Sequence, residues 1–170
     1  MQAMIAVCGS DSDDRRLNHD IMKKAEEVGR EIARKGAVLL SGGRGGIMEA
    51  SCKGAKEEGG TTIGILPYSK EEANPYVDFS IATGLGNLRN FVIVNAADAI
   101  IAICGRSGTM SEISFAMILE KPVVFLKGSD GVVDKLIEAG IAKEKNCYVA
   151  TSPREAVEMA FHAIKSHQTP

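Results

Sequence analysis

The sequence lacks long hydrophobic runs and a strong net charge. No stretch approaches the roughly 18 apolar residues that a membrane-spanning helix requires. The first apolar run, Met4–Cys8, is far shorter than the h-region of a signal peptide and has no basic segment ahead of it. The 20 basic side chains are balanced by 22 acidic ones, and the formal charge of -2 argues against a nucleic-acid partner held by bulk charge. We therefore expect a cytoplasmic protein that binds neither a membrane nor a nucleic acid.

Cysteine and histidine are sparse and scattered. The four cysteines form no Cys-x-x-Cys pair and the three histidines do not cluster, so the sequence predicts no metal site. Cys8 and Cys104 end apolar runs, where a free cysteine usually behaves as a small hydrophobic residue. We expect reduced thiols without a redox or nucleophilic role. His19, His162 and His167 fall on polar helix faces or near the C-terminal tail, which is typical of ordinary surface histidines.

The order of apolar and amphipathic segments predicts the fold. Short runs rich in Val, Ile and Ala alternate with longer amphipathic segments, as in βαβ units around a parallel sheet that is buried on both faces. We predict an α/β fold in one domain, residues 1–170: a Rossmann-like three-layer sandwich, with a mostly parallel sheet and helices on both faces. Strands are expected near 3–8, 37–41, 61–66, 98–104, 122–126 and 146–149, and helices near 16–35, 46–59, 86–96, 109–120, 130–139 and 153–166.

One segment departs from this alternation. Pro67–Pro75 is polar, flanked by prolines and the longest irregular stretch of the chain. Long irregular segments in compact domains often carry function. The segment is therefore a candidate for a mobile lid or an oligomer contact.

Three glycine-containing loops follow predicted strands: Cys8–Ser12, Ser41–Gly46 and Gly105–Thr109. In an open parallel sheet, ligands bind at the carboxyl ends of the strands, where helix N-termini offer free N–H groups to an anion. Four glycines within 41–46 exceed what one turn requires, so binding of phosphate or carboxylate is favoured over a purely structural turn. The predicted ligand-binding residues are Gly9, Ser10, Gly42, Gly43, Gly45, Gly46, Asn90, Gly105, Arg106, Ser107, Gly108 and Thr109.

Two common nucleotide motifs are absent from these loops. A dinucleotide-binding Gly-x-Gly-x-x-Gly would follow the first strand, where this chain has Gly9-Ser-Asp-Ser12. No Gly-Lys-Ser/Thr of a Walker loop occurs, which argues against hydrolysis of a nucleoside triphosphate.

Glu112 has two interpretations. Thr109-Met-Ser-Glu112 fits a capping box, in which the glutamate bonds back to the start of its helix, and the local sequence favours this structural role. Glu112 also lies just beyond the third glycine loop. It is therefore the most attractive catalytic carboxylate of the chain.

Three arginines are candidates for contacts with an anion. Arg89 stands at the start of a largely apolar segment, where it could grip a phosphate or carboxylate, or lie on the surface with its stem over apolar groups. Arg44 and Arg106 interrupt glycine loops and point either to an anionic ligand or to solvent, and Arg106 ranks higher. Nearby, Asn87 is a candidate helix cap and Asn90 a candidate ligand contact.

The segments Ser41-Gly-Gly-Arg-Gly-Gly-Ile-Met48, Asn87-Leu-Arg-Asn90 and Gly105-Arg-Ser-Gly-Thr-Met-Ser-Glu112 together resemble the LOG-like superfamily of Rossmann-type proteins. That superfamily includes cytokinin-activating phosphoribohydrolases, which hydrolyse a nucleoside 5′-monophosphate to base and ribose 5-phosphate, and molybdenum-cofactor carrier proteins. Arg89 and Glu112 match the family's arginine and glutamate. The resemblance thus implies catalytic roles for both residues.

The chain also departs from the hydrolase motifs. Cys104 replaces a proline, Arg106 a glycine and Asn90 a lysine, and the full pattern looks more like the carrier branch. The resemblance therefore implies two alternatives: a phosphoribohydrolase, or a carrier or sensor of an anionic pterin such as the molybdenum cofactor. Neither requires a resident cofactor, although a nucleotide or the molybdenum cofactor is a candidate bound ligand.

Related proteins are usually dimers, so the resemblance implies a homo-oligomer. The helices at Phe91–Ala97 and Ile113–Leu119 could form its interface or be buried within one subunit.

Overall fold

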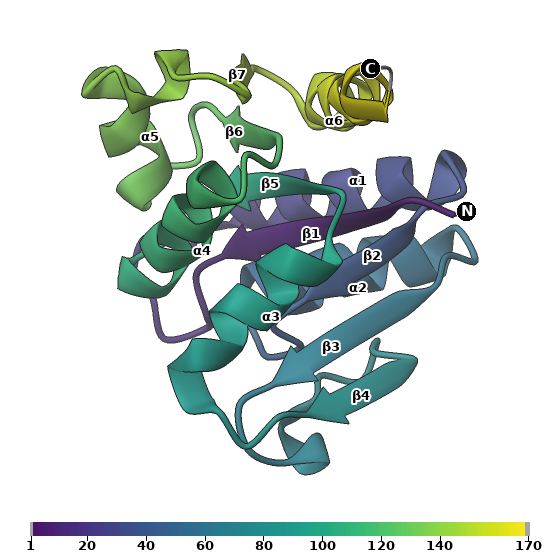
Figure 1. Ribbon diagram of the computed structural model, residues 1–170. Helices are drawn as coiled ribbons and strands as arrows, with labels where there is room; N and C mark the ends of the chain where they lie inside the picture. Colours follow the sequence, from purple (N-terminus) through teal and green to yellow (C-terminus); the bar gives the residue numbers. More distant parts are fainter. Residues whose placement is uncertain (1, 169–170) are drawn as a thin grey trace.

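The computed structural model describes residues 2–168, with the side chains of residues 2–166. One seven-stranded sheet has the order β4-β3-β2-β1-β5-β6-β7, and every neighbouring pair is parallel (Figure 1). This confirms the predicted α/β class. The strands are β1 (Met4–Gly9), β2 (Val38–Ser41), β3 (Thr62–Leu66), β4 (Phe79–Ala82), β5 (Ala99–Ile103), β6 (Val123–Leu126) and β7 (Cys147–Ala150).

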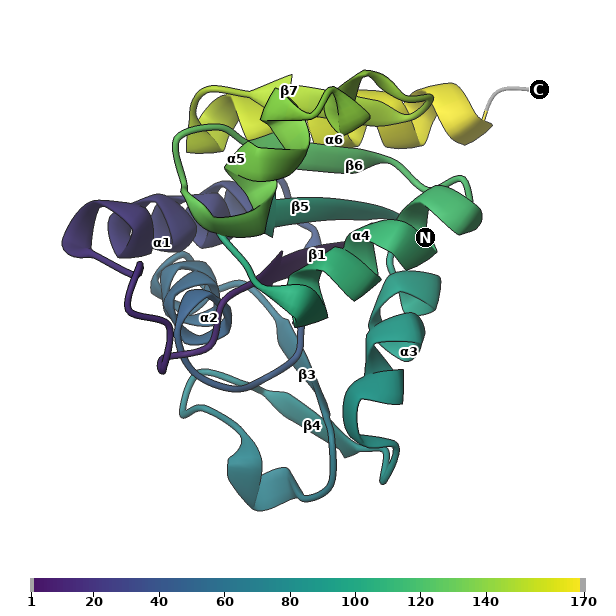
Figure 2. The same cartoon turned by 90° about the vertical axis from the view of Figure 1, so that its left-hand side faces the viewer.

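Helices cover both faces of the sheet and complete a three-layer sandwich. Figure 2 shows α1 and α2 on one side of the sheet and α3 and α4 on the other. The packing of buried side chains places α6 with α1 and α2, and α5 with α3 and α4. The helices are α1 (His19–Arg34), α2 (Ile47–Glu57), α3 (Arg89–Ala96), α4 (Ser107–Ile118), α5 (Gly131–Glu138) and α6 (Pro153–Gln168), with short 3-10 turns η1 (Lys70–Glu72), η2 (Gly86–Leu88) and η3 (Ile141–Lys143).

The alternation of side chains along each strand creates two hydrophobic cores. In β1, Ile5 and Val7 pack under α1 and α2, whereas Ala6 and Cys8 face α3 and α4. Every residue of β5 is buried, because this central strand is covered on both faces. The apolar runs that predicted the strands are therefore the residues that separate the two helical layers.

The edge strand β4 was not predicted from the sequence. Among the strands of residues 2–168, this one pairs only with β3, and none of its residues is buried. Phe79 is 60% and Ile81 is 48% exposed, so the segment has no run of core-facing residues that would have marked it as a strand. A short edge strand is held mainly by backbone hydrogen bonds, which any sequence can make.

Two predicted helices begin later than expected. The helix predicted from residue 16 begins at His19, because the Asn18 side chain accepts a hydrogen bond from the Ile21 N–H and caps it. The helix predicted over 86–96 starts as the 3-10 turn η2 and becomes α3 at Arg89. The end of this first helix is close to the predicted residue 35: Lys35 is its C-cap, and Gly36, with a φ of 72°, follows the cap and stops the helix.

The segment Pro67–Pro75 is anchored to the second glycine loop. The Asn74 side chain is buried and donates hydrogen bonds to the carbonyl oxygens of Gly43 and Arg44. Ser69 and Glu72 form a capping box around η1. The segment is thus tied at one end and ordered by its own turn, and its role as a lid or an oligomer contact remains a prediction.

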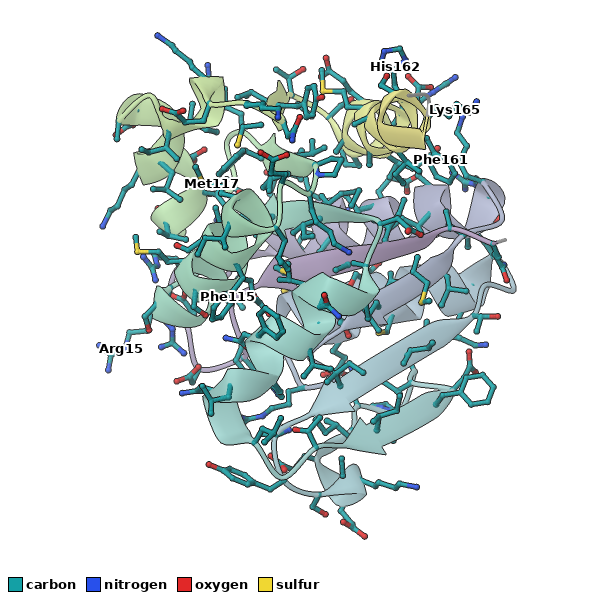
Figure 3. The ribbon with its side chains drawn as sticks, viewed as in Figure 1. Arg15, Phe115, Met117, Phe161, His162 and Lys165 are labelled. Carbon is teal, nitrogen blue, oxygen red and sulfur yellow. The ribbon has the colours of Figure 1, made fainter. Side chains whose placement is uncertain are left out.

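The described histidine side chains lie on the surface. His19 is exposed at the start of α1, and His162 is exposed on the outer face of α6 (Figure 3). The side chain of His167 lies outside the described residues. Among the helices that the structure describes, none combines the length and apolar character needed to cross a membrane.

We expect Gly54→Ala to destabilise the fold by about 2 to 3 kcal/mol, as for overpacking in a core. Helices α1 and α2 cross so closely that a β-carbon at Gly54 would collide with the backbone carbonyl of Glu26. Chemical denaturation monitored by circular dichroism measures the loss. Gly108→Ala is the control, because its added methyl group would meet nothing closer than 3.9 Å. Equal stability of the two variants would contradict the close crossing.

Candidate functional site

A cleft of about 240 Å³ lies at the carboxyl ends of the central strands. Figure 2 views the sheet from the side toward which these strand ends point. Strand β1 has β2 as its neighbour on one side in the sheet and β5 as its neighbour on the other, so the strand order changes direction at β1. Open parallel sheets bind ligands at such a switch point. The lining residues are Gly9, Ser10, Asp11, Arg44, Met48, Asn87, Arg89, Asn90, Arg106, Ser107, Gly108, Thr109 and Glu112.

The start of α4 corrects the capping-box interpretation of Glu112. The N-cap residue is Arg106, α4 begins at Ser107, and no side chain caps it. Thr109 therefore lies within the first turn and cannot be the cap. Glu112 follows one turn later, is only 7% exposed and lines the cleft. Its carboxylate is available to the cleft, although the sequence alone favoured the structural role.

Burial controls the protonation of Glu112. Removal from water raises the pKa of its carboxyl group from 4.5 to about 7. A hydrogen bond with the Cys8 thiol and the charge of Arg89 act in the opposite direction. Both the ionised and the neutral acid are therefore populated near neutral pH, which suits a group that exchanges protons.

Arg89 is buried in the first turn of α3, with 8% of its surface exposed, so the interpretation as a surface arginine is wrong. Its Nη1 donates a hydrogen bond of 3.0 Å to Oδ1 of Asn90. Its Nε is buried without a hydrogen-bond partner among the described residues, and no described carboxylate forms an ion pair with the guanidinium. Burial lowers its pKa, while the charge of Glu112 raises it. A buried cation in this state is incompletely compensated.

Asn90 joins the two helices that flank the cleft. Its Oδ1 accepts from Arg89, while its Nδ2 donates to the Gly108 carbonyl at 3.3 Å and to Ser111 Oγ at 2.8 Å. These three bonds use most of the capacity of the amide and fix the guanidinium of Arg89 relative to the start of α4. Direct contact between Asn90 and a ligand remains a prediction.

The third glycine loop has a strained backbone that its neighbours hold in place. Cys104 has a φ of 57° and Gly105 a φ of 98°, a region that favours glycine. The Ser129 hydroxyl accepts the Cys104 N–H at 2.8 Å, and the Val132 N–H at the start of α5 donates to the Gly105 carbonyl at 2.9 Å. This support directs the chain into α4, whose first-turn residues Ser107–Thr109 line the cleft and have N–H groups without a partner inside the helix.

The glycines of the second loop serve close packing. A β-carbon at Gly42 would lie 3.2 Å from Nη2 of Arg89, and one at Gly43 would lie 3.0 Å from the Cα of Gly64 in β3. Gly45 and Gly46 lie against the first loop, residues 10–12. None of these four residues lines the cleft, nor does Gly105. Their predicted contacts with ligand remain predictions, and the packing gives a structural reason for each glycine.

A hydrogen-bond network ties the first loop to the third. The Ser10 hydroxyl donates to Asp14 and accepts the Gly105 N–H at 3.0 Å. Asp14 is buried and also paired with Arg16 at 2.9 Å. The hydrogen bonds from Arg16 hold the pKa of Asp14 well below its usual range, and the bond from Ser10 acts in the same direction, so this carboxylate keeps its charge.

The rim of the cleft carries Arg44 and Arg106, whose side chains are 47% and 45% exposed. Each is paired with an aspartate that lies in the first loop or directly after it. Arg44 Nε lies 3.3 Å from Asp11, and Arg106 Nη2 donates to Asp13. Both arginines therefore border the cleft and are partly neutralised by neighbouring acids.

Neither these aspartates nor Met48 were predicted from the sequence as residues of the site. A usable signal existed for Asp11 and Asp13, since they directly follow β1 at the edge where the ligand was expected. Asn87 was expected as a helix cap, but the N-cap of α3 is Leu88 and no side chain caps it. Asn87 lines the cleft instead.

Cys8 and Cys104 are buried free thiols, as expected for cysteines at strand ends. Burial and the neighbouring Glu112 raise the pKa of the Cys8 thiol well above its ordinary value. A protonated thiol is a poor nucleophile. Cys8 therefore acts toward Glu112 as a weak hydrogen-bonding neighbour.

Comparison with known proteins identifies relatives along most of the chain. Residues 2–157 match the SLOG cluster4 family. A probable cytokinin riboside 5′-monophosphate phosphoribohydrolase of Oryza sativa subsp. japonica is 33% identical in an alignment of 140 positions that covers 76% of this chain but only 60% of the rice protein. The molybdenum cofactor binding protein of Rippkaea orientalis is 37% identical, with a TM-score of 0.81 over 99% of both chains. The molybdenum cofactor carrier protein of Chlamydomonas reinhardtii is 32% identical, with a TM-score of 0.82 over 97% of this chain and 99% of that one.

The fold and the cleft define a Rossmann-type protein of the LOG-like superfamily, as the motifs predicted. Within that class, the chain belongs to the SLOG cluster4 family. The two solved structures superpose on nearly the whole chain, which confirms the three-layer architecture.

We expect Glu112→Gln to stabilise the protein relative to wild type increasingly as the pH rises. The neutral form of Glu112 is favoured in the folded protein, because its pKa is raised. Its contribution to stability is therefore complete below pH 4.5 and is lost as the pH rises through about 7. Between pH 4 and pH 8 the difference in free energy of unfolding should change by up to about 3 kcal/mol in favour of the variant. Urea denaturation across that pH range, with Glu138→Gln as an exposed control, measures it. A difference that stays constant with pH would contradict the burial of an acid at this position.

Proposed function

We propose that the protein binds a small phosphorylated ligand at the carboxyl ends of the strands, with a nucleoside 5′-monophosphate as the first candidate. The observation that carries the proposal is the buried guanidinium of Arg89, which has no ion pair and an unpartnered Nε among the described residues. A buried cation is stable only when it is compensated. A phosphate group supplies that compensation with several acceptor oxygens at once.

In the proposed complex, the phosphate lies between Arg89 and the N-terminus of α4. The N–H groups of Ser107–Thr109 and the dipole of the helix favour a negative charge there. Asn90 links the two parts of this site, because it bonds both Arg89 and the Gly108 carbonyl. The cleft is slightly smaller than the roughly 300–1,000 Å³ of sites that enclose a drug-sized ligand, so the base of a nucleotide would extend toward the rim.

Glu112 supports a further step, hydrolysis of the N-glycosidic bond. It lines the same cleft, and its pKa of about 7 leaves much of it ionised at neutral pH. An ionised Glu112 would orient a water molecule and stabilise positive charge at C1′ of the sugar. The water oxygen bonds to C1′, the C1′–N bond breaks, and its electron pair leaves with the base. One proton of the water ends on the base, and the products are free base and ribose 5-phosphate.

A second candidate function is carriage or sensing of an anionic pterin such as the molybdenum cofactor. The similarity to two molybdenum cofactor proteins favours it, and so do the departures from the hydrolase motifs at Cys104, Asn90 and Arg106. The same cleft would hold the phosphate of the cofactor as cargo. In this case Arg106 would determine specificity at the rim.

Helices α3 and α4 support the proposal of a homodimer. Four exposed apolar residues of η2, α3 and α4 are here called the α3/α4 face: Leu88 (69%) ends η2, Phe91 (42%) lies on α3, and Met110 (43%) and Ile118 (74%) lie on α4. Phe91 packs edge-to-face on Phe115 at 5.4 Å, and Figure 3 shows Phe115 on α4. Neither helix carries an exposed charged residue, so the face can pair with a second copy of itself without burying a charge.

Arg89→Met should weaken binding of a nucleoside 5′-monophosphate by about 10- to 100-fold, the range expected when a charged hydrogen-bonding group is lost. Isothermal titration against a panel of such nucleotides measures the change. Arg15→Met removes the same charge from an exposed side chain that points away from the molecule (Figure 3), and it serves as the control. Equal affinities of the two variants for a nucleotide that wild type binds would contradict the proposed phosphate site.

Incubation with the same nucleotides, followed by chromatography of free base, distinguishes turnover from carriage. Release of base by wild type, abolished in Glu112→Gln, is expected for the hydrolase. If no nucleotide loses its base at protein concentrations where a single turnover would be visible, the hydrolase proposal fails for those substrates and the carrier remains.

The homodimer predicts a sedimentation mass of twice 18.0 kDa. Substitution of both Leu88 and Ile118 by Lys should shift the protein to a monomer, because two cations would then be buried in the interface. Phe79→Lys changes an equally apolar exposed residue on β4 and should leave the mass unchanged. A wild-type monomer would refute the interface.

A further inference from the structure

The connection from the first loop toward α1, residues 10–16, holds acidic side chains in two different states. Asp14 is 4% exposed and fixed by Arg16 and Ser10, so it anchors the loop. Asp13 is 70% exposed, and among the described residues its carboxylate bonds only to Arg106. Asp13 can therefore leave Arg106 without disturbing the anchor.

Arg106 occupies the position at which an anion would meet the start of α4. It is the N-cap residue of that helix and lines the cleft beside Ser107 and Gly108. Its side chain is 45% exposed, and its Nε lies 4.0 Å from Asp14. A ligand phosphate at the helix N-terminus and the carboxylate of Asp13 would thus compete for the same guanidinium.

We propose that Asp13 is a specificity-determining residue that acts as an internal competitor for Arg106. This role rests on the proposed phosphate site. An exposed ion pair between arginine and a carboxylate contributes little net free energy, whereas the oxygens of a phosphate make several charge-assisted hydrogen bonds. A dianionic phosphate displaces the Asp13 carboxylate from the Arg106 guanidinium. A singly charged ligand interacts too weakly with Arg106 to displace Asp13, so its affinity stays low. Asp11, paired with Arg44 at 3.3 Å, repeats the arrangement across the cleft, but it also accepts the Ser12 N–H and is less free to move.

The test uses inorganic pyrophosphate as a probe in a buffer without divalent cations. Asp13→Asn should bind pyrophosphate about two- to fivefold more tightly than wild type, because an exposed ion pair that competes with the ligand has been removed. Asp20→Asn makes the same change in charge on an aspartate that is 75% exposed on α1 and should have a smaller effect. In an Arg106→Met background, Asp13→Asn should have no effect, because it acts only through that arginine.

Affinity that is unchanged or weakened in Asp13→Asn would overturn the proposal, and weakening would mean that Asp13 orients Arg106 for the ligand. Absence of pyrophosphate binding in both wild type and Asp13→Asn would overturn it as well. If pyrophosphate binds as expected but no nucleoside 5′-monophosphate binds, the competition by Asp13 stands and the nucleotide proposal falls.

Discussion

The parallel pairing of every strand is the constraint on which the rest of this molecule depends. A parallel connection must cross over the sheet, so each strand is followed by a loop at the same edge, and the sheet is buried on both faces. Three polar, glycine-containing loops thereby meet at one place, although they lie far apart in the sequence. Strand β1 lies at the switch in strand order, and its loop contacts both of the others: Ser10 bonds Gly105, and Gly46 packs against residues 10–12.

That constraint explains why much of the fold could be predicted from the sequence. A strand covered on both faces has to be almost wholly apolar, and β5 and β6 are recognisable for this reason. Edge strand β4 obeys no such rule and was missed. The start of α4 could not be predicted either. Thr109-x-x-Glu112 satisfies a capping box locally, but the loop held by Ser129 and Val132 places the N-cap at Arg106, three residues earlier.

Part of the cleft lining could be predicted, but the environments of its residues could not. Arg89 was open to a surface or a buried interpretation, because burial depends on how α3 packs against the loop at Gly42, far away in the sequence. The four glycines of the second loop suggested contact with an anion, yet their neighbours are backbone atoms and side chains of the protein itself. Pairing between loops, as in Asp13 with Arg106, depends on tertiary structure and leaves no pattern in the sequence.

The charges of Arg89 and Glu112 link ligand binding to protonation. In the free protein, the charge of Arg89 lowers the pKa of Glu112 and thus opposes the effect of burial. A phosphate bound to Arg89 would neutralise the charge of the guanidinium and place a negative charge near Glu112. The pKa of Glu112 would therefore rise further. Because linkage is reciprocal, the neutral acid would in turn favour the ligand. A hydrolase must therefore keep Glu112 ionised although the negative charge of its substrate favours protonation. A carrier, in contrast, gains affinity for its ligand when Glu112 takes up a proton.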